Sequence, residues 1–95
     1  DEIYSQLAYD DGGHFSALDN ANHRDKTIVV DGMSKAYNVS GWRVGHVIAP
    51  PKLTKAFRIV QSTMGLMAPT PFQVAARHAL TNATVRSQMK ATVEH

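Results

Sequence analysis

The sequence predicts part of an α/β domain, in which helices flank a parallel sheet. Residues 27–30, "TIVV", form a β-branched run without polar alternation. Such a run is typical of a strand that is buried on both faces, as in a parallel sheet. From Leu53 onward, apolar residues recur at helical spacing in three successive segments. Strands followed by helices indicate one α/β layer.

Three strands are expected in the first half of the chain, over residues 3–9, 27–30 and 43–49. The first is a short apolar segment that ends at "DDGG", residues 10–13, a strong turn signal. Residues 14–26 are polar and mixed, so a connecting loop with one helical turn is expected there. The last strand is closed by Pro50 and Pro51, because proline cannot donate to a sheet.

Three helices are expected in the second half. Residues 53–64 carry an apolar stripe with basic residues and glutamine on the other side, and Pro51 suits the start of this helix. The sequence "LMAPTP" breaks the helix, and Pro71 opens the next one over "FQVAARHAL". Thr81 and Asn82 end that helix and cap a third, whose apolar stripe is Val85, Met89 and Val93.

The composition excludes several classes of protein. The 95 residues are 43% hydrophobic and 19% charged, which is ordinary for a globular domain. Ten Lys and Arg are scattered against eight acids without a basic run, so no nucleic-acid site is expected. No apolar run approaches the roughly 18 residues that span a membrane. The absence of cysteine fits a reducing compartment, and the first residues do not resemble a secretion leader, so we expect a cytoplasmic protein.

The five histidines show no metal-ligand pattern. No pair has the i, i+4 spacing of a helical metal site, and no acid partners them in the sequence. We therefore expect no metal site.

The stretch "VVDGMSKAYNVSGWRVG", residues 29–45, carries the residues best suited to chemistry. Lys35 follows a predicted buried strand, and ligands of open α/β sheets sit just outside the carboxyl ends of strands. A lysine partly removed from water beside another cation is activated to attack a carbonyl and form a Schiff base. Arg43 supplies a cation and a forked donor for a phosphate, and Ser34 adds a hydroxyl. The alternative is a surface loop with ordinary basic residues.

Asp1 and Tyr4 suggest an electron-poor aromatic ring as the ligand. At the end of a strand the chain can turn and present both side chains to one cleft. The carboxylate would then keep a ring nitrogen protonated, and the phenol would donate to a ring oxygen. The alternative is an acid at a sheet edge and a half-buried tyrosine.

Together, "DEIY" and "TIVVDGMSKAYNVSGWRVGHVIAPPKL" resemble the class I/II aminotransferases, which are fold-type I pyridoxal-phosphate enzymes. The shared pattern is Asp-x-x-Tyr, a gap of about thirty residues, Ser-Lys and then "SGWRVG"; here 31 positions separate Tyr4 from Lys35. The segment "APTPFQVAARHAL" is also similar to the helix that follows in this family. The resemblance thus covers essentially all 95 residues.

The resemblance implies a role for each of these residues. Lys35 is the catalytic Schiff-base lysine and later the proton shuttle. Asp1 pairs with the pyridinium nitrogen of the cofactor, and Tyr4 hydrogen-bonds its phenolic oxygen. Ser34 and Arg43 bind the phosphate. Some family members carry another serine or threonine three positions before the lysine, where this chain has Gly32.

The resemblance also implies a context larger than this chain. Residues 1–95 correspond to the C-terminal portion of a pyridoxal-phosphate-binding large domain, with its mostly parallel sheet and flanking helices; the N-terminal part and the small domain are absent. The full-length parent is expected to be a homodimer that transfers amino groups between amino acids and 2-oxo acids, and the isolated chain to be inactive.

Other functions share this cofactor site. A fold-type I lyase or decarboxylase would bind the cofactor through the same residues. An aminotransferase-like effector domain of a transcription regulator would sense the cofactor without catalysis. A small α/β domain without a ligand is the remaining alternative.

Overall fold

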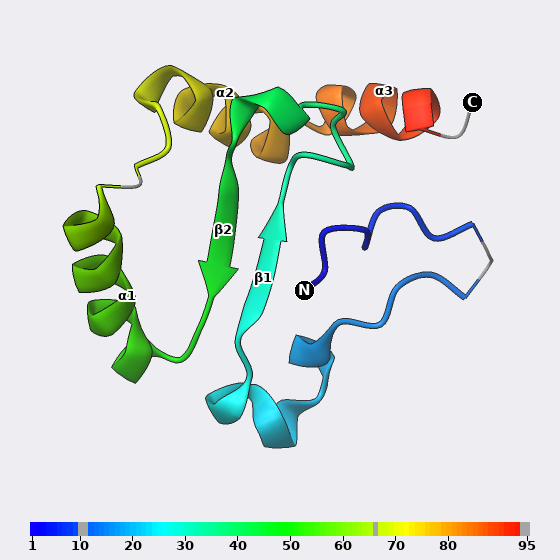
Figure 1. Cartoon of the computed structure of the whole chain (residues 1–95). Helices are drawn as coiled ribbons and strands as arrows, with labels where there is room; N and C mark the ends of the chain where they lie inside the picture. Colours follow the sequence, from blue (N-terminus) through cyan, green and yellow to red (C-terminus); the bar gives the residue numbers. More distant parts are fainter. Residues whose placement is uncertain (10–11, 66, 94–95) are drawn as a thin grey trace.

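The computed structural model describes residues 1–9, 12–65 and 67–93 (Figure 1). The elements are η1 (Ala17–Asp19), η2 (Ala21–Lys26), β1 (Val29–Gly32), η3 (Ser40–Trp42), β2 (Gly45–Ile48), α1 (Pro51–Met64), α2 (Thr70–Thr81) and α3 (Ala83–Val93). Both strands thus precede the three α-helices along the chain, as the sequence predicts. Figure 1 shows the two strands side by side, with α1 beyond β2 and with α2 and α3 across one end of the sheet.

The two strands pair antiparallel, so the parallel arrangement expected from the "TIVV" run does not hold between them. The register pairs Val29 with Ile48 and Gly32 with Gly45. The twelve residues 33–44 turn the chain straight back without a crossover α-helix, and such a direct return suits antiparallel strands. The described strands therefore show an antiparallel pair and no parallel one, because an apolar run does not specify strand direction.

Residues 3–9 do not form the strand expected there. The amides of Ser5 and Leu7 donate to the carbonyls of Glu2 and Tyr4 at 2.8 and 2.9 Å, so this segment folds into consecutive turns. The Glu2 amide still donates to the Val30 carbonyl at 2.8 Å, and the chain therefore starts against the outer edge of β1. Of the predicted turn at residues 10–13, positions 10–11 lie outside the described residues.

The loop between the strands contains two residues with positive φ. Tyr37 N donates to Met33 O at 3.1 Å and closes one turn after β1, and Asn38 follows with φ of 51°. Arg43 ends η3 with φ 55° and ψ 42°, in the left-handed region. A residue in this conformation cannot continue a strand, so β2 begins at Gly45 instead of the expected position 43.

The helices follow the predicted boundaries closely. Pro51 lies in the first turn of α1, and Gly65 ends this helix with φ of 64°. Asn82 separates α2 from α3, as predicted, because its Oδ1 accepts from the amides of Thr84 at 3.0 Å and Val85 at 3.1 Å. A stack between Trp42 and Phe72, with centroids 5.4 Å apart, joins η3 to α2.

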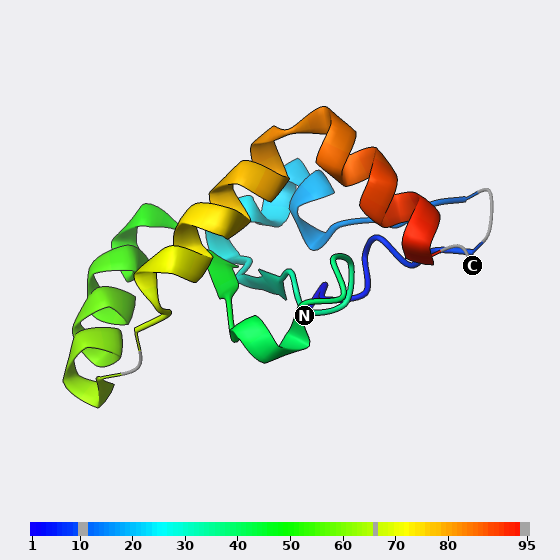
Figure 2. The same cartoon turned by 90° about the horizontal axis from the view of Figure 1, so that it is seen from above.

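The chain buries little of its own apolar surface. Among the described residues, Val29, Met33, Ala36 and Ala76 form the buried core, and Pro50 is also buried. The accessible surface is 7356 Å², against about 5400 Å² expected for a compact monomer of this mass. The radius of gyration is 14.7 Å, compared with about 13 Å for a compact 100-residue domain. Figure 2 shows the same openness from above, with α1 standing apart from the strands.

Glu2 anchors the first loop to the start of the chain. Its Oε1 accepts from the Ala17 amide at 2.9 Å and from Ser16 Oγ at 3.1 Å, and its Oε2 lies 3.3 Å from His14 Nε2. The hydrogen bond from the Ala17 backbone is the main reason why the pKa of the Glu2 carboxyl lies below its ordinary value.

Glu2→Gln is therefore expected to lower the unfolding temperature at neutral pH. A carboxyl whose pKa is lower in the folded state stabilises the fold above its unfolded pKa, and this stability is lost as pH falls through the folded pKa. The difference in unfolding temperature between wild type and Glu2→Gln should thus be larger at neutral pH than below about pH 4. Thermal unfolding of both proteins, followed by circular dichroism at the two pH values, measures this difference. Asp25→Asn, at an exposed position, is the matched control; an equal effect of both variants would contradict the role of Glu2.

Candidate functional site

A cavity of about 190 Å³ lies at the end of the sheet where β1 runs into the loop. Its lining includes three of the residues predicted from the sequence: Asp1, Ser34 and Arg43. They come from the start of the chain, from the residues after β1 and from the residue after η3. The remaining lining residues are Ile3, Val30, Asp31, Gly32, Val44 and Gly45. We call this space the small cavity.

The return of the chain brings Ser34 and Arg43 to the same cavity. The Met33 amide donates to the Val44 carbonyl at 3.4 Å, which ties together the two ends of the loop. Ser34 and Arg43 each lie next to one of these two residues. Arg43 is exposed, and its Nη1 donates to the Ser40 carbonyl at 3.1 Å. A hydroxyl and a guanidinium at one cavity are a donor set that suits an anion such as a phosphate.

Asp1 brings a carboxylate to the same cavity. Its Oδ1 accepts from the Ile3 amide at 3.0 Å, which orients the side chain within the first turn. The pairing of Glu2 with β1 holds this turn against the sheet. The lining of the cavity therefore combines the Asp1 and Asp31 carboxylates with a hydroxyl and a guanidinium, a set that suits a ligand with a cationic and an anionic end.

Lys35 and Tyr4 contact each other beside this cavity. The Lys35 Nζ lies over the Tyr4 ring at 5.9 Å from its centroid, a cation–π distance. Both side chains are exposed and neither is among the residues that line the small cavity. The structure thus groups the predicted residues as a triplet and an adjacent pair. The expectation that Lys35 is partly removed from water is not met in this chain.

Gly32 lies at the end of the sheet, where neighbouring atoms leave little room for a side chain. A Cβ added there would lie 3.2 Å from each of three atoms: Gly45 Cα, the Val44 carbonyl oxygen and Ile3 Cδ1. These contacts are closer than most Cβ atoms make, so a serine or threonine would require its neighbours to shift. The departure from the family pattern at this position is therefore consistent with the close pairing of β1 and β2.

Two histidines do have acidic partners, contrary to the expectation from the sequence. His46 Nε2 lies 3.9 Å from Asp31 Oδ2 across the strand pair, and His14 pairs with Glu2 as described above. These partners lie 12 or more positions apart, so spacing along a helix could not reveal them. Asp31 also lines the small cavity. It was not predicted as a site residue, because its partners are distant in the sequence. Its position at the end of a predicted strand was the signal that could have identified it.

Residues 1–9, 12–65 and 67–93 contain no group of three or more His, Cys, Asp or Glu side chains placed to hold a metal ion. Among the helices of the same residues, none is long and apolar enough to cross a membrane.

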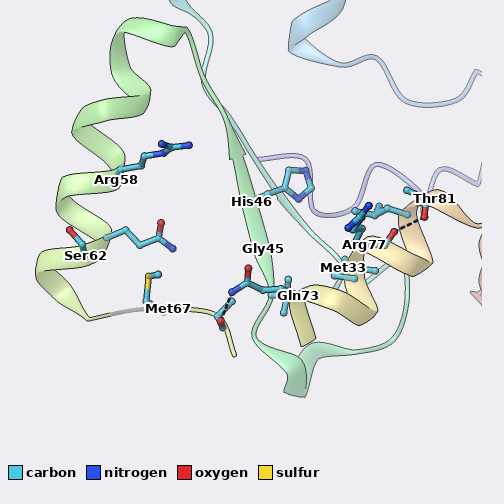
Figure 3. A pocket seen from close by; sticks show the side chains of 14 residues that line it. Met33, Gly45, His46, Arg58, Ser62, Met67, Gln73, Arg77 and Thr81 are labelled. Carbon is cyan, nitrogen blue, oxygen red and sulfur yellow. Dashed lines mark hydrogen bonds between the residues drawn. The ribbon is translucent and has the colours of Figure 1, made fainter. Parts of the chain in front are cut away.

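A larger cavity of about 870 Å³ lies between β2, α1 and α2. Figure 3 shows Arg58 and Ser62 on α1 and Arg77 and Thr81 on α2 around the space beside β2. None of the five predicted site residues lines it. Three of them, Asp1, Ser34 and Arg43, line the small cavity instead.

Comparisons with known proteins give the family of the chain. The family described as "Aminotransferase class I and II" matches residues 1–95. The chain is 38% identical over 86 residues to a (5-formylfuran-3-yl)methyl phosphate transaminase of Methanocaldococcus jannaschii, which covers 90% of this chain and 23% of that protein. It is 40% identical over 82 residues to a probable N-acetyl-LL-diaminopimelate aminotransferase of Bacillus subtilis, covering 86% of this chain and 20% of the relative.

A solved structure has the same fold. A crystal structure from Methanococcus jannaschii, described as similar in its active site to kynurenine aminotransferases, matches with a TM-score of 0.87 and 32% identity. The match covers 98% of this chain and 25% of that one. The chain therefore spans about a fifth to a quarter of the length of the proteins that it matches.

Proposed function

The chain belongs to the class I and II aminotransferase family, and on this basis we propose that it is the cofactor-holding part of an amino-acid aminotransferase. The cofactor is pyridoxal 5'-phosphate. The single observation that supports the proposal best is the convergence of Asp1, Ser34 and Arg43 on one cavity, with Lys35 beside it. The whole protein would exchange amino groups between an amino acid and a 2-oxo acid.

The donor set of the cavity fits this cofactor. Ser34 and Arg43 would hold the phosphate through a hydroxyl and a guanidinium. The Asp1 carboxylate would face the ring nitrogen, and the Tyr4 hydroxyl would donate to the ring oxygen. Lys35, whose Nζ lies over the Tyr4 ring, would carry the covalent attachment. When bound, the cofactor supplies an electron sink for the carbanion formed at the substrate.

The residues of this chain would then bind, orient and move protons. Arg43 and Ser34 would hold the phosphate and so fix the position of the cofactor relative to Lys35. Asp1 keeps a proton on the ring nitrogen by offering a carboxylate to it. The Lys35 Nζ would take the α-proton of the substrate as a general base and would later deliver a proton as a general acid.

Several finer features belong to the same proposal. The chain would form the C-terminal portion of a large domain with a mostly parallel sheet, in which β2 is an antiparallel member. The longer protein would be cytoplasmic and would act as a homodimer. The two relatives described above are named as transaminases, which favours transamination over the lyase, decarboxylase and regulatory alternatives.

Reductive labelling of the full-length protein tests the proposal. The protein is incubated with pyridoxal phosphate, reduced with borohydride, digested and analysed by mass spectrometry. The label is expected on Lys35 and not on Lys52, an exposed lysine of α1. A label spread over surface lysines would contradict the assignment. Product analysis with the unreduced, intact protein separates the reactions: a 2-oxo acid without ammonia or carbon dioxide indicates transamination.

A further inference from the structure

Arg43, which lines the small cavity, has a backbone conformation that arginine rarely adopts. Its φ of 55° and ψ of 42° lie in the left-handed region, where the Cβ of a residue comes too close to a carbonyl oxygen. The surrounding structure must therefore hold this conformation, and residues held in this way cluster at active sites and ligand-binding sites. Because Arg43 directly follows η3, the position of η3 determines the position of Arg43.

The hydrogen bonds of η3 are local. The Trp42 amide donates to the Val39 carbonyl at 2.9 Å, and Arg43 Nη1 donates to the Ser40 carbonyl at 3.1 Å. Among the described residues, no side chain caps the start of this turn. A helix of three residues is not stable by itself, so η3 depends on a contact with another element.

The Trp42 side chain provides such a contact with α2. Its ring stacks on the Phe72 ring, with centroids 5.4 Å apart and planes inclined by 13°. Both residues are half-buried, and Figure 1 shows η3, in green, at the end of the sheet that α2 crosses. Trp42 directly precedes Arg43, so a fixed ring at Trp42 restricts the backbone at Arg43.

Phe72 is held firmly because the start of α2 is well bonded. The Phe72 and Gln73 amides donate to the Pro69 carbonyl at 3.0 and 3.1 Å. Gln73 Nε2 also donates to the Ala68 carbonyl at 2.6 Å. Further along the helix, Ala76 is buried. Helix α2 thus presents the Phe72 ring to η3 from a fixed position.

We propose that Phe72 is a positioning residue for the cofactor phosphate: through its stack with Trp42, it keeps Arg43 in the conformation that places the guanidinium at the small cavity. The inference rests on the proposed function, because it takes pyridoxal phosphate to be the ligand of Arg43. The free energy of a stacked aromatic pair and the cost of a left-handed residue are of the same order. Loss of the stack is therefore enough to let Arg43 relax to another conformation.

Titration of the full-length apo-protein with pyridoxal phosphate tests the proposal. Phe72→Leu keeps an apolar side chain but removes the ring, and we expect it to weaken cofactor binding by about 3- to 10-fold. Phe72→Tyr keeps the ring and should retain the wild-type affinity. Phe57→Leu makes the same change on α1 and should also bind the cofactor as the wild type does. An unchanged affinity in Phe72→Leu would overturn the proposal.

A double-mutant cycle separates positioning of Arg43 from a general loss of stability. If Phe72 acts through Arg43, Phe72→Leu should cost no further affinity once Arg43→Ala has removed the guanidinium. Losses that add in the double variant would overturn the proposal. Turnover of Phe72→Leu at saturating cofactor should equal that of the wild type, because Phe72 positions the phosphate and not the Lys35 amine. A fall in turnover as large as the loss of affinity would count against this role.

Amide hydrogen exchange of the full-length protein without cofactor gives an independent readout. We expect Phe72→Leu to speed exchange at the Trp42 amide by about 3- to 10-fold, because η3 opens more often without the stack. Exchange at the Glu2 amide, which bonds β1, should not change. Equal exchange at Trp42 in both proteins would overturn the proposal. Faster exchange at Trp42 together with a failed Lys35 label would refute the proposed function and leave the role of the stack in ordering Arg43 intact.

Discussion

Lys35→Ala in the full-length protein is expected to lower the turnover number of transamination by about 10²- to 10⁴-fold. The substitution removes the amine that would hold the cofactor and take the α-proton of the substrate. It leaves Ser34 and Arg43 at the small cavity, so the cofactor should still bind without covalent attachment. Steady-state kinetics with a panel of amino acids, together with a cofactor-binding assay, measures the two effects separately.

The Lys35 experiment has a close control within the chain. Lys52→Ala makes the same change at an exposed position in the first turn of α1, and its turnover should equal that of the wild type. A Lys35→Ala protein that turns over at the wild-type rate would refute the catalytic assignment. Loss of the cation–π contact with Tyr4 does not by itself predict a large kinetic effect, because exposed contacts of this kind are worth only about 0.5–1 kcal/mol.

Arg43→Ala is expected to weaken cofactor binding by about 10- to 100-fold. Hydrogen bonds to a charged group contribute roughly 1.5–3 kcal/mol, and about 1.4 kcal/mol corresponds to a factor of ten in affinity. Titration of the full-length apo-protein with pyridoxal phosphate measures the change. Arg58→Ala removes the same charge from the larger cavity and should bind the cofactor normally; equal losses in both variants would indicate a general effect of charge.

A second variant at this position separates binding from folding. Arg43 has φ of 55°, and this conformation costs a residue with a Cβ about 1–2 kcal/mol. Arg43→Gly should therefore bind the cofactor as poorly as Arg43→Ala while unfolding at an equal or higher temperature. A lower unfolding temperature for Arg43→Gly would mean that the side chain contributes to folding rather than to the site.

The helices were predictable because their signals are local. Proline in the first turn of α1, glycine after its last residue and the Asn82 cap are each a property of one residue and its neighbours. Periodicity then identifies the apolar stripe without knowledge of what covers it. These signals survive even in a chain that buries few residues.

The strands were harder to predict, because pairing depends on segments far apart in sequence. The "TIVV" run predicted burial on both faces, yet Val30 is 46% exposed in this chain. The register and direction of β1 and β2 go with the close pairing of Gly32 with Gly45 and with the loop 33–44, which reverses the chain. Neither feature has a local signature.

The candidate site was predictable in part. Asp1, Ser34 and Arg43 converge on one cavity although up to 42 positions separate them, and it was the order and spacing of the family pattern that predicted this. The contact between Lys35 and Tyr4 and the Asp31–His46 pair required three-dimensional information. The exposure of Lys35 depends on which residues surround it in the folded chain, and the amino-acid composition does not specify them.

The stack between Trp42 and Phe72 gives the molecule a built-in optical probe. Trp42 is the sole tryptophan of the chain, and it directly precedes Arg43. A ligand ring that absorbs in the near ultraviolet, held at the small cavity, would accept the excitation energy of this indole and quench its fluorescence. The intensity of the emitted light would then report how much of the protein is occupied, without a label or a substitution in this segment.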